Sequence, residues 1–220
     1  MIRNIFVIAL ILIASASSAK SQPLIVVELF TSSVCPACPP ADRKLLELSQ
    51  KENIITLGCH VSYMNSPPAF DKLSQEFCDI RQHGYVGLTE EKRIYTPQMI
   101  VNGKHLFIGS NDAKLESALK SAENESVQLI QMEVKNDGVI YFSLPSTEYG
   151  SYRLWAFGYK NQGETSVYAR PAISYNNLGA WQGFATTQSF QKPDVPIDGI
   201  IIIAQENGYE GIIAAGELKF

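Results

Sequence analysis

The chain has 220 residues, enough for one large domain or two small ones. Hydrophobic residues make up 45% of it and charged residues 18%, a composition typical of a globular protein with a buried core. The net charge is −4 and no block of Lys and Arg stands out, which argues against nucleic acid as a partner.

Residues 1–19 have the layout of a secretory signal peptide. Arg3 precedes a short apolar run over residues 5–13, and small residues follow at 15–19. The run is too short to cross a bilayer comfortably, although an uncleaved N-terminal anchor is the alternative. We therefore expect a periplasmic or secreted protein with no membrane contact after cleavage. In such a compartment cysteines favour disulfides over free thiols.

Strand and helix patterns alternate in the part of the chain that follows. Residues 24–30 (LIVVELF) form a nearly continuous apolar run, which predicts a central strand. Helical spacing over residues 42–50 predicts a helix, and residues 53–61 predict the next strand. Ser66-Pro67 predicts the start of a second helix, because proline suits a first helical turn. The expected apolar face of this helix consists of Phe70, Leu73, Phe77 and Ile80.

A hairpin and a third helix complete this part. The strands predicted over residues 98–101 and 105–108 flank Asn102-Gly103, a strong hairpin signal, and Asp112 is expected to cap the helix that follows. The predicted order is β-α-β-α-β-β-α. The first two strands should be parallel because a helix joins them, and the last two antiparallel because a tight turn joins them. We predict an α/β domain over residues 22–122.

The pattern changes near residue 126, where helical spacing almost disappears. We predict a small antiparallel β domain over residues 126–220, with a sandwich-like arrangement. The junction at residues 123–126 is too short for a free linker, so this domain should pack on the first. The predicted strands cover residues 129–134, 139–144, 152–159, 183–190, 197–204 and 211–218.

Cys35 and Cys38 form a C-x-x-C motif between the first predicted strand and the first helix. Two intervening residues let the sulfur atoms meet at disulfide distance, and unpaired N–H groups at a helix start favour the thiolate of the upstream cysteine. We therefore assign Cys35 as the nucleophile and Cys38 as the resolving cysteine of dithiol/disulfide exchange. Because a residue before proline resists the α conformation, Pro39-Pro40 should delay the regular helix to Cys38 or Pro39.

Two other interpretations of this pair stay open. In one interpretation Cys35 and Cys38 form a purely structural disulfide, and in the other they form a thiolate site for Cu(I). The metal interpretation lacks a clear third ligand, although His60, His83 and His105 are present, and each lone histidine fits a surface or hydrogen-bonded role better. We expect no metal and no cofactor.

Cys59 and Cys78 are a separate pair in the prediction. Cys59 ends the second strand and Cys78 lies on the following helix. A structural disulfide that pins this helix to the sheet is our first interpretation. A second redox pair that exchanges with Cys38, or two buried free thiols, are the alternatives.

The element order and the C-x-x-C motif together are the arrangement of thioredoxin folds. In those folds a cis-proline precedes the third strand opposite the dithiol, and Thr96-Pro97 stands at that place here. A cis bond at Pro97 turns the backbone of Thr96 toward an extended substrate. Thioredoxins also carry a buried acid on the first strand, where this chain has Glu28. Glu28 either moves protons to and from the resolving thiol, or points to an edge, where it is solvated or caps backbone N–H groups.

Three stretches of this sequence resemble an uncharacterised secreted bacterial family that is described as thioredoxin-like. They are VVELFTSS at residues 26–33, CPACPPAD at 35–42 and YTPQMIVNG at 95–103, and the stretches at 60–63, 174–178 and 211–218 also look like it. The resemblance covers most of the chain beyond the signal peptide. It implies a thioredoxin fold and a C-x-x-C site, and it implies no substrate. Cys59 and Cys78 depart from the family pattern, which leaves open whether CPAC is the only exchanging pair.

These observations predict a periplasmic thiol–disulfide oxidoreductase, with protein thiols or disulfides as substrates and a redox partner protein. We expect a monomer. Two alternatives remain: a non-catalytic binding module on the same fold, and a Cu(I)-handling thiol protein. The motif is compatible with either direction of electron flow.

Overall fold

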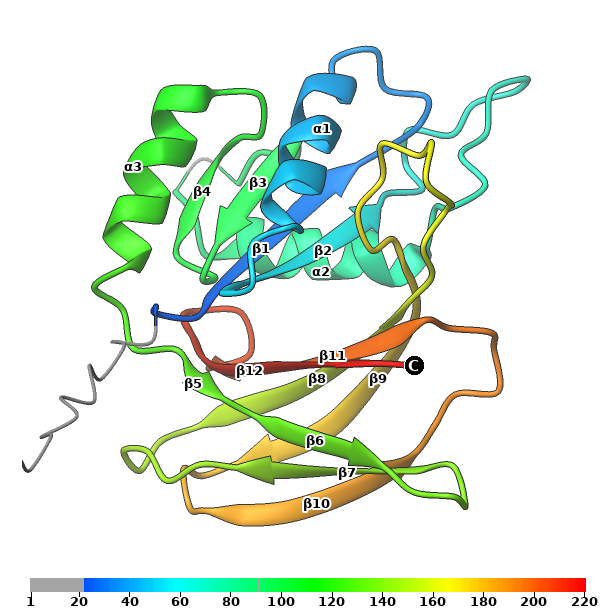
Figure 1. Ribbon diagram of the computed structural model, residues 1–220. Helices are drawn as coiled ribbons and strands as arrows, with labels where there is room; N and C mark the ends of the chain where they lie inside the picture. The colour runs from blue at the N-terminus through cyan, green and yellow to red at the C-terminus, as the bar shows by residue number, and fades with distance from the viewer. Residues whose placement is uncertain (1–21, 91) are drawn as a thin grey trace, which may run out of the picture.

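The computed structural model describes residues 22–90 and 92–220, so the predicted signal peptide at 1–19 lies outside the described residues. The first part of the chain forms a four-stranded sheet with the strand order β2-β1-β3-β4 (Figure 1). Strands β1 and β2 are parallel, and the other two pairings are antiparallel. The strands are β1 (Ile25–Thr31), β2 (Ile54–His60), β3 (Gln98–Val101) and β4 (His105–Ile108).

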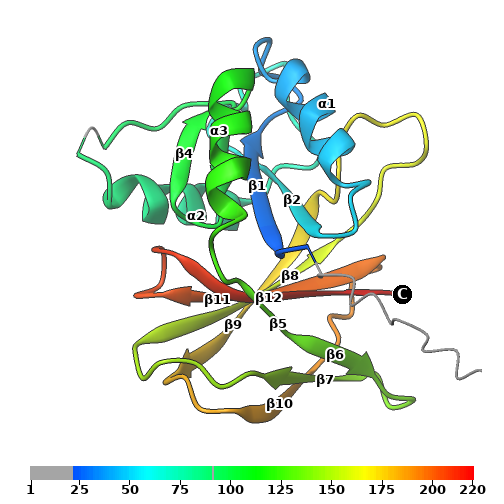
Figure 2. The same ribbon diagram turned by 60° about the vertical axis from the view of Figure 1, so that its left-hand side comes forward.

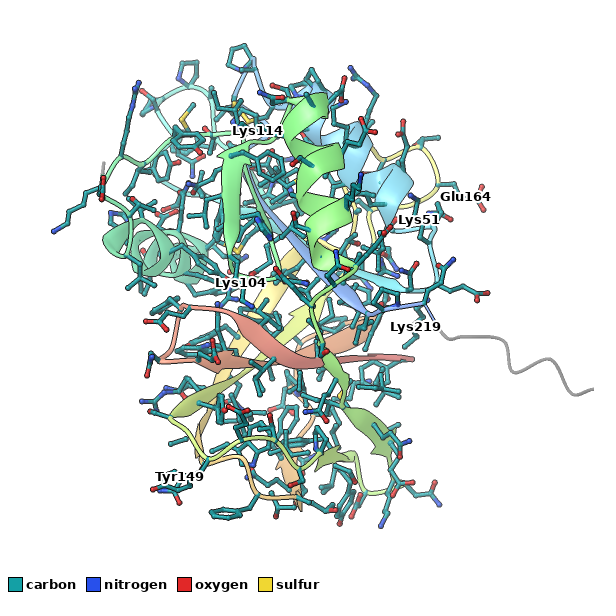
Figure 3. All side chains as sticks on the ribbon, turned by 90° about the vertical axis from the view of Figure 1, so that its left-hand side faces the viewer. Lys51, Lys104, Lys114, Tyr149, Glu164 and Lys219 are labelled. Carbon is teal, nitrogen blue, oxygen red and sulfur yellow. A yellow bond between two sulfur atoms is a disulfide. The ribbon has the colours of Figure 1, made fainter. Side chains whose placement is uncertain are left out.

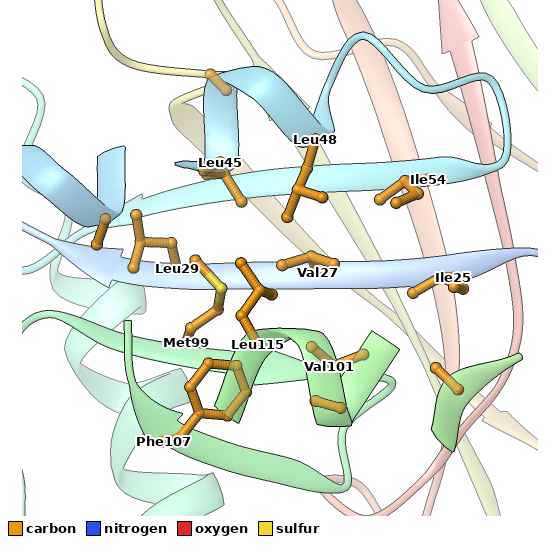
Figure 4. Packing of buried hydrophobic residues seen from close by; sticks show 14 residues of the cluster. Ile25, Val27, Leu29, Leu45, Leu48, Ile54, Met99, Val101, Phe107 and Leu115 are labelled. Carbon is orange, nitrogen blue, oxygen red and sulfur yellow. The ribbon is translucent and has the colours of Figure 1, made fainter. Parts of the chain in front are cut away.

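Helices α1 (Pro39–Leu48) and α3 (Asp112–Ala122) cover one face of this sheet (Figure 2). Val27 and Leu29 of β1 point into this layer, where they meet Leu45 of α1 and Leu115 of α3 (Figure 4). Helix α2 (Glu76–Gly87) packs on the opposite face. Because β1 is buried on both faces, its sequence is almost continuously apolar. We call this part, from β1 to α3, the α/β half.

The remaining strands form two further sheets, which we call the β half. A five-stranded sheet has the order β5-β12-β11-β8-β9, and a three-stranded sheet has the order β10-β7-β6. An apolar layer lies between the two sheets, with side chains such as Phe142 of β7 and Ile202 of β11. The strands are β5 (Gln128–Leu129), β6 (Gln131–Val134), β7 (Val139–Leu144), β8 (Tyr152–Tyr159), β9 (Ala172–Trp181), β10 (Thr186–Gln191), β11 (Gly199–Glu206) and β12 (Ile212–Lys219).

The two halves share an apolar layer. Val26 of β1 and Leu57 of β2 pack with Phe157 of β8 and Ile201 of β11, and all four side chains are buried. The five-stranded sheet is therefore covered on both faces, which explains why β11 contains four consecutive isoleucines. No helix in the described part of the chain is long and apolar enough to cross a membrane.

The second helix begins ten residues later than the sequence predicts. Helix α2 starts at Glu76, and the segment from 62 to 75 is a loop with a cis bond between Pro67 and Pro68. The predicted apolar face is wrong, since Phe70 is 58% exposed and Ile80 65% exposed. A proline pair alone does not prevent a helix, since Pro39-Pro40 begins α1. The physical reason is tertiary: Asp71 in this loop accepts the Ser33 N–H and contacts His60, and both partners lie outside the loop.

Three smaller differences follow from local chemistry. Asn111 caps α3 by accepting a hydrogen bond from the Lys114 backbone N–H at 3.0 Å, so the predicted cap at Asp112 is wrong by one residue. The strand expected over residues 129–134 is split into β5 and β6, which belong to different sheets. The sequence analysis predicts no strand where β9 lies. The side chains of β9 are mostly half-buried and exposed, so its sequence lacks the apolar signal that marks the other long strands.

Candidate functional site

The Cys35–Cys38 disulfide lies in the turn that joins β1 to α1, with a Cα separation of 5.4 Å. Backbone hydrogen bonds from Cys35 N to Ser32 O (3.1 Å) and from Cys38 N to Cys35 O (3.2 Å) build this turn. Cys38 is the N-cap residue of α1 and Pro39 is the first helical residue, as the two prolines predict. The pair therefore stands at a helix N-terminus, where the helix dipole favours negative charge. The expected unpaired N–H groups are absent at this start, because Pro39 and Pro40 have no N–H and the Ala41 and Asp42 N–H groups donate to Cys38 O.

The two cysteines differ in their access to solvent. Cys35 is 4% exposed and Cys38 is fully buried, while Ser33, Pro36 and Ala37 around them are exposed. Of the two residues, Cys35 is therefore the one that a second molecule can approach. This order agrees with a reaction in which Cys35 meets the partner and Cys38 acts from inside.

Thr96 and Pro97 lie beside this turn, and the bond between them is cis. Phe30 of β1 pairs with Gln98 of β3, so the antiparallel register places Pro97 next to the end of β1. Pro97 also lies near the first turn of α1, because a Cβ added at Gly109 would be 3.4 Å from Pro97 Cβ and 3.0 Å from Ala41 Cβ.

Two side chains from the α2 side hold this segment. The Gln82 side-chain amide donates to Tyr95 O at 2.8 Å and to Gln98 Oε1 at 2.9 Å, on either side of the cis bond. Tyr63, which is 41% exposed, shares a hydrogen bond with the Thr96 side chain, although burial has the larger effect on its phenol and raises its pKa. Thr96 is thus presented between the disulfide turn and the 62–75 loop.

Glu28 has an ion-pair partner that neither sequence interpretation contains. Its carboxylate accepts hydrogen bonds from Arg81 Nε at 2.5 Å and Arg81 Nη2 at 2.9 Å, and from the Tyr85 hydroxyl. Both members of the ion pair are buried. Glu28 points to the α2 face of the sheet, whereas α1 lies on the other face, because successive side chains of a strand alternate. The structure therefore does not bring Glu28 to the cysteine pair.

A different buried acid, Asp42, lies one helical turn after Cys38. The Asp42 N–H donates to Cys38 O at 3.1 Å, and the Thr31 hydroxyl donates to Asp42 Oδ1 at 2.8 Å. Residues four apart share a helix face, so Asp42 stands directly behind Cys38 in the site. Burial raises the pKa of Asp42 to about 6, and the hydrogen bond from Thr31 offsets only part of that effect.

His60 and Asp71 adjoin the same place. His60 is the register partner of Thr31, so the two side chains lie side by side on the α1 face of the sheet. His60 Nδ1 is 2.7 Å from Asp71 Oδ2, and this oxygen also accepts the Ser33 N–H at 2.8 Å. Burial alone would raise the pKa of Asp71, but the hydrogen bonds from His60 and Ser33 hold it well below its usual range. Asp71 thus stays ionised and links His60 to the cysteine turn.

The sequence interpretation missed Asp42, His60 and Asp71 as members of the site. The spacing of Asp42 four residues after Cys38 is a readable signal, because any helix after the motif would place it on the same face. The pairing of His60 with Asp71 has no such signal, since Asp71 lies in a loop where the sequence predicts a helix.

A second disulfide joins Cys59 of β2 to Cys78 in the first turn of α2, with a Cα separation of 5.4 Å. Both cysteines are fully buried on the α2 face, among side chains such as Phe30. In residues 22–90 and 92–220, no group of three or more His, Cys, Asp and Glu side chains is placed to hold a metal ion. His83 bonds to Asp79 O, and His105 to Glu125, away from the cysteine pair.

Comparisons with known proteins give a family and a fold. A family model described as "Protein of unknown function (DUF1223)" matches residues 26–197. No curated protein matches the sequence. The X-ray structure of a protein from Agrobacterium tumefaciens is similar over 91% of this chain and 96% of that one, with 24% identity and a TM-score of 0.81. HBP35 of Porphyromonas gingivalis is similar over 90% of this chain and 76% of its own, with 16% identity and a TM-score of 0.60. At these identities the likeness is one of fold alone.

Proposed function

The chain belongs to the DUF1223 family, whose function is unknown, and from this premise we propose that it is a periplasmic or secreted thiol–disulfide oxidoreductase. Cys35 and Cys38 are its exchanging pair. The observation that carries the proposal is the meeting of three features in one place: a C-x-x-C disulfide, the N-terminus of α1 and the cis bond at Pro97.

The fold of the α/β half supports this proposal. Its element order, its parallel β1–β2 pair and its antiparallel β3–β4 hairpin agree with the thioredoxin-like fold that we propose for it, and the β half is an addition to that fold. The two disulfides agree with an oxidising compartment outside the cytoplasm.

In the reducing direction the reaction starts from the open dithiol. The Cys35 thiolate, favoured by the positive end of the α1 dipole, attacks one sulfur of a client disulfide and expels the other as a thiolate. This forms a mixed disulfide between Cys35 and the client. Cys38 then loses its proton and attacks the Cys35 sulfur, which closes the Cys35–Cys38 disulfide and releases the second client thiolate. Two electrons pass from the protein to the client, and the oxidising direction is the reverse.

The Cys38 proton needs an acceptor inside the site because Cys38 has no solvent contact. Asp42 fits this role, since it stands one turn behind Cys38 and its raised pKa of about 6 leaves it mostly ionised at neutral pH. Glu28 does not fit, because its carboxylate is paired with Arg81 on the face of the sheet opposite to α1. We therefore assign the proton transfer to Asp42 and a structural role to Glu28.

Thr96 and Pro97 have a positioning role in this proposal. Thr96 is half-buried beside the disulfide turn, where an extended client segment can add main-chain hydrogen bonds to its backbone. The neighbouring 62–75 loop offers two exposed aromatic side chains, Tyr63 and Phe70, to the same client.

The test is catalysis by defined cysteine variants. Wild-type protein should accelerate the reduction of insulin by dithiothreitol or the reshuffling of a scrambled disulfide substrate, and Cys35→Ser should abolish this. Cys38→Ser should instead accumulate a covalent complex with the client that excess reductant dissolves, because the mixed disulfide forms and is not resolved.

The double variant Cys59→Ala/Cys78→Ala is the matched control, and it should keep the activity under conditions where it is folded. Full activity of Cys35→Ser in both assays would overturn the proposal. A wild-type protein without activity in either assay would point instead to an inert disulfide in a binding module.

A further inference from the structure

The loop between β8 and β9, residues 160–171, leaves the β half and packs on the α/β half. Figure 1 shows it beside β2 and α1, and Figure 3 shows Glu164 of this loop at the level of the helices. Arg170 O accepts the Gly58 N–H at 3.1 Å, and Arg170 Nη1 donates to Thr56 Oγ1 at 2.7 Å. A Cβ at Gly58 would lie 2.8 Å from Ala169 O, so glycine permits this close approach. The loop is thus docked on the edge strand of the first sheet.

Tyr168 in this loop lies against the cluster of buried side chains formed by Asp42, His60 and Asp71, which we call the acidic pocket. Its ring meets the His60 ring edge to face, with centroids 4.8 Å apart and planes at 83°. Burial raises the pKa of the Tyr168 phenol, and the charges of Asp42 and Asp71 raise it further, which places both carboxylates near its ring. Tyr168 itself is only half-buried. It therefore has one side toward solvent and the other toward the pocket.

His60 adds a second observation about this pocket. Its Nε2 is buried and has no hydrogen-bond partner among the described residues, while Nδ1 is held by Asp71. An unpaired buried polar atom destabilises the folded state, so a purely structural position favours a different side chain. In a site that moves protons, an unpaired ring nitrogen can accept or donate a proton.

We propose that Tyr168 is a positioning residue of the redox site: its ring closes the pocket of Asp42, His60 and Asp71 against bulk water. This inference rests on the proposed function, because the pocket serves the proton of Cys38. In this proposal a loop of the β half shields the proton-accepting side chains of the α/β half. The titratable and charged groups that face the pocket are Asp42 and Arg43 from α1, His60 from β2, Asp71 from the 62–75 loop and Tyr168 itself.

The consequence concerns Asp42 as a proton acceptor. Burial is the main cause of its raised pKa, so water admitted by loss of the Tyr168 ring should lower that pKa from about 6 toward its usual value of 3.8. A weaker base accepts the Cys38 proton more slowly. By Brønsted behaviour we expect closure of the Cys35–Cys38 disulfide to slow by about 10-fold at pH 7.

The experiment compares Tyr168→Ala with Tyr168→Phe, which keeps the ring. Tyr149→Ala is the matched control, because Tyr149 is 75% exposed and lies at the far end of the β half (Figure 3). The first readout is the ¹³C NMR titration of the Asp42 carboxyl in the oxidised protein, assigned with Asp42→Asn. The second is the pH profile of client release from the mixed disulfide.

We expect Tyr168→Ala to move the Asp42 titration downward and to slow client release, while Tyr168→Phe and Tyr149→Ala behave as wild type. If Tyr168→Ala proves unstable, Tyr168→Gln tests the same point with a side chain that draws water in. An Asp42 titration that stays in place in the folded variant refutes the role of Tyr168. A wild-type protein without thiol activity refutes the proposed function instead, and the NMR readout is independent of that result.

Discussion

Replacement of Asp42 by asparagine should make the protein more stable at alkaline pH. Asp42 is 3% exposed, and burial raises its pKa from 3.8 to about 6. Because the folded state binds this proton more tightly than the unfolded state, the associated stability is fully present below pH 3.8 and is lost as the pH rises through 6. Asparagine keeps an oxygen for the Thr31 hydroxyl and has no charge to bury.

The magnitude follows from the same two values. One pKa unit corresponds to about 1.4 kcal/mol, so the ionised carboxylate costs the folded state about 3 kcal/mol at pH 8. At pH 4 most of this penalty is absent, since the folded-state carboxyl is still protonated. The stability difference between Asp42→Asn and wild type should therefore grow by about 2–3 kcal/mol from pH 4 to pH 8.

Urea unfolding of the oxidised proteins at pH 4 and pH 8 measures this difference, with both disulfides intact. The comparison between two pH values removes any constant effect of the substitution on packing. A difference that is the same at both pH values, or that favours wild type more at pH 8, would refute the account of Asp42 as a buried acid held for its chemistry.

Three further predictions concern the residues around the site. Arg81→Met should lower the stability by about 3–5 kcal/mol in urea unfolding because it leaves the Glu28 charge buried and unpaired, and a wild-type unfolding curve would contradict this. Loss of the Cys59–Cys78 disulfide should cost about 3 kcal/mol yet preserve thiol exchange, whereas loss of exchange in the folded variant would make this pair part of the reaction. Asp71→Asn should destabilise the protein at pH 7, because the lowered pKa of Asp71 stabilises the folded state at every pH above the usual carboxyl pKa of 3.8. This stability is lost as the pH falls toward the lowered pKa. Thermal unfolding at pH 7 and pH 3 should therefore show that the stability difference between variant and wild type shrinks with acid.

The sequence predicts the framework of this fold because local patterns determine most of it. A buried parallel pair needs apolar runs such as residues 25–31, a hairpin needs a turn such as Asn102-Gly103, and both are visible in the chain. The sequence predicts the second helix from one proline and four apolar residues at helical spacing. In the structure, residues 62–75 form a loop in which Phe70 is exposed, and Ile80 lies on the solvent side of the shorter helix α2.

The candidate site divides in the same way. The cysteine pair and Pro97 can be predicted because the motif and its place between a strand and a helix are local features. The partner of Glu28 cannot, since Arg81 is 53 residues away and its contact depends on how α2 packs. The contact between Tyr168 and His60 cannot be predicted either, because Tyr168 comes from the loop between two strands of the β half.

The redox equilibrium of the two disulfides is the most direct test of the central claim. Oxidised protein is held in glutathione buffers of graded potential, trapped by alkylation and mapped by mass spectrometry of its peptides. We predict that Cys35–Cys38 opens reversibly at a defined potential while the fully buried Cys59–Cys78 stays closed. If Cys35–Cys38 stays closed at every potential, or opens only after Cys59–Cys78, the protein is not an oxidoreductase of the kind proposed.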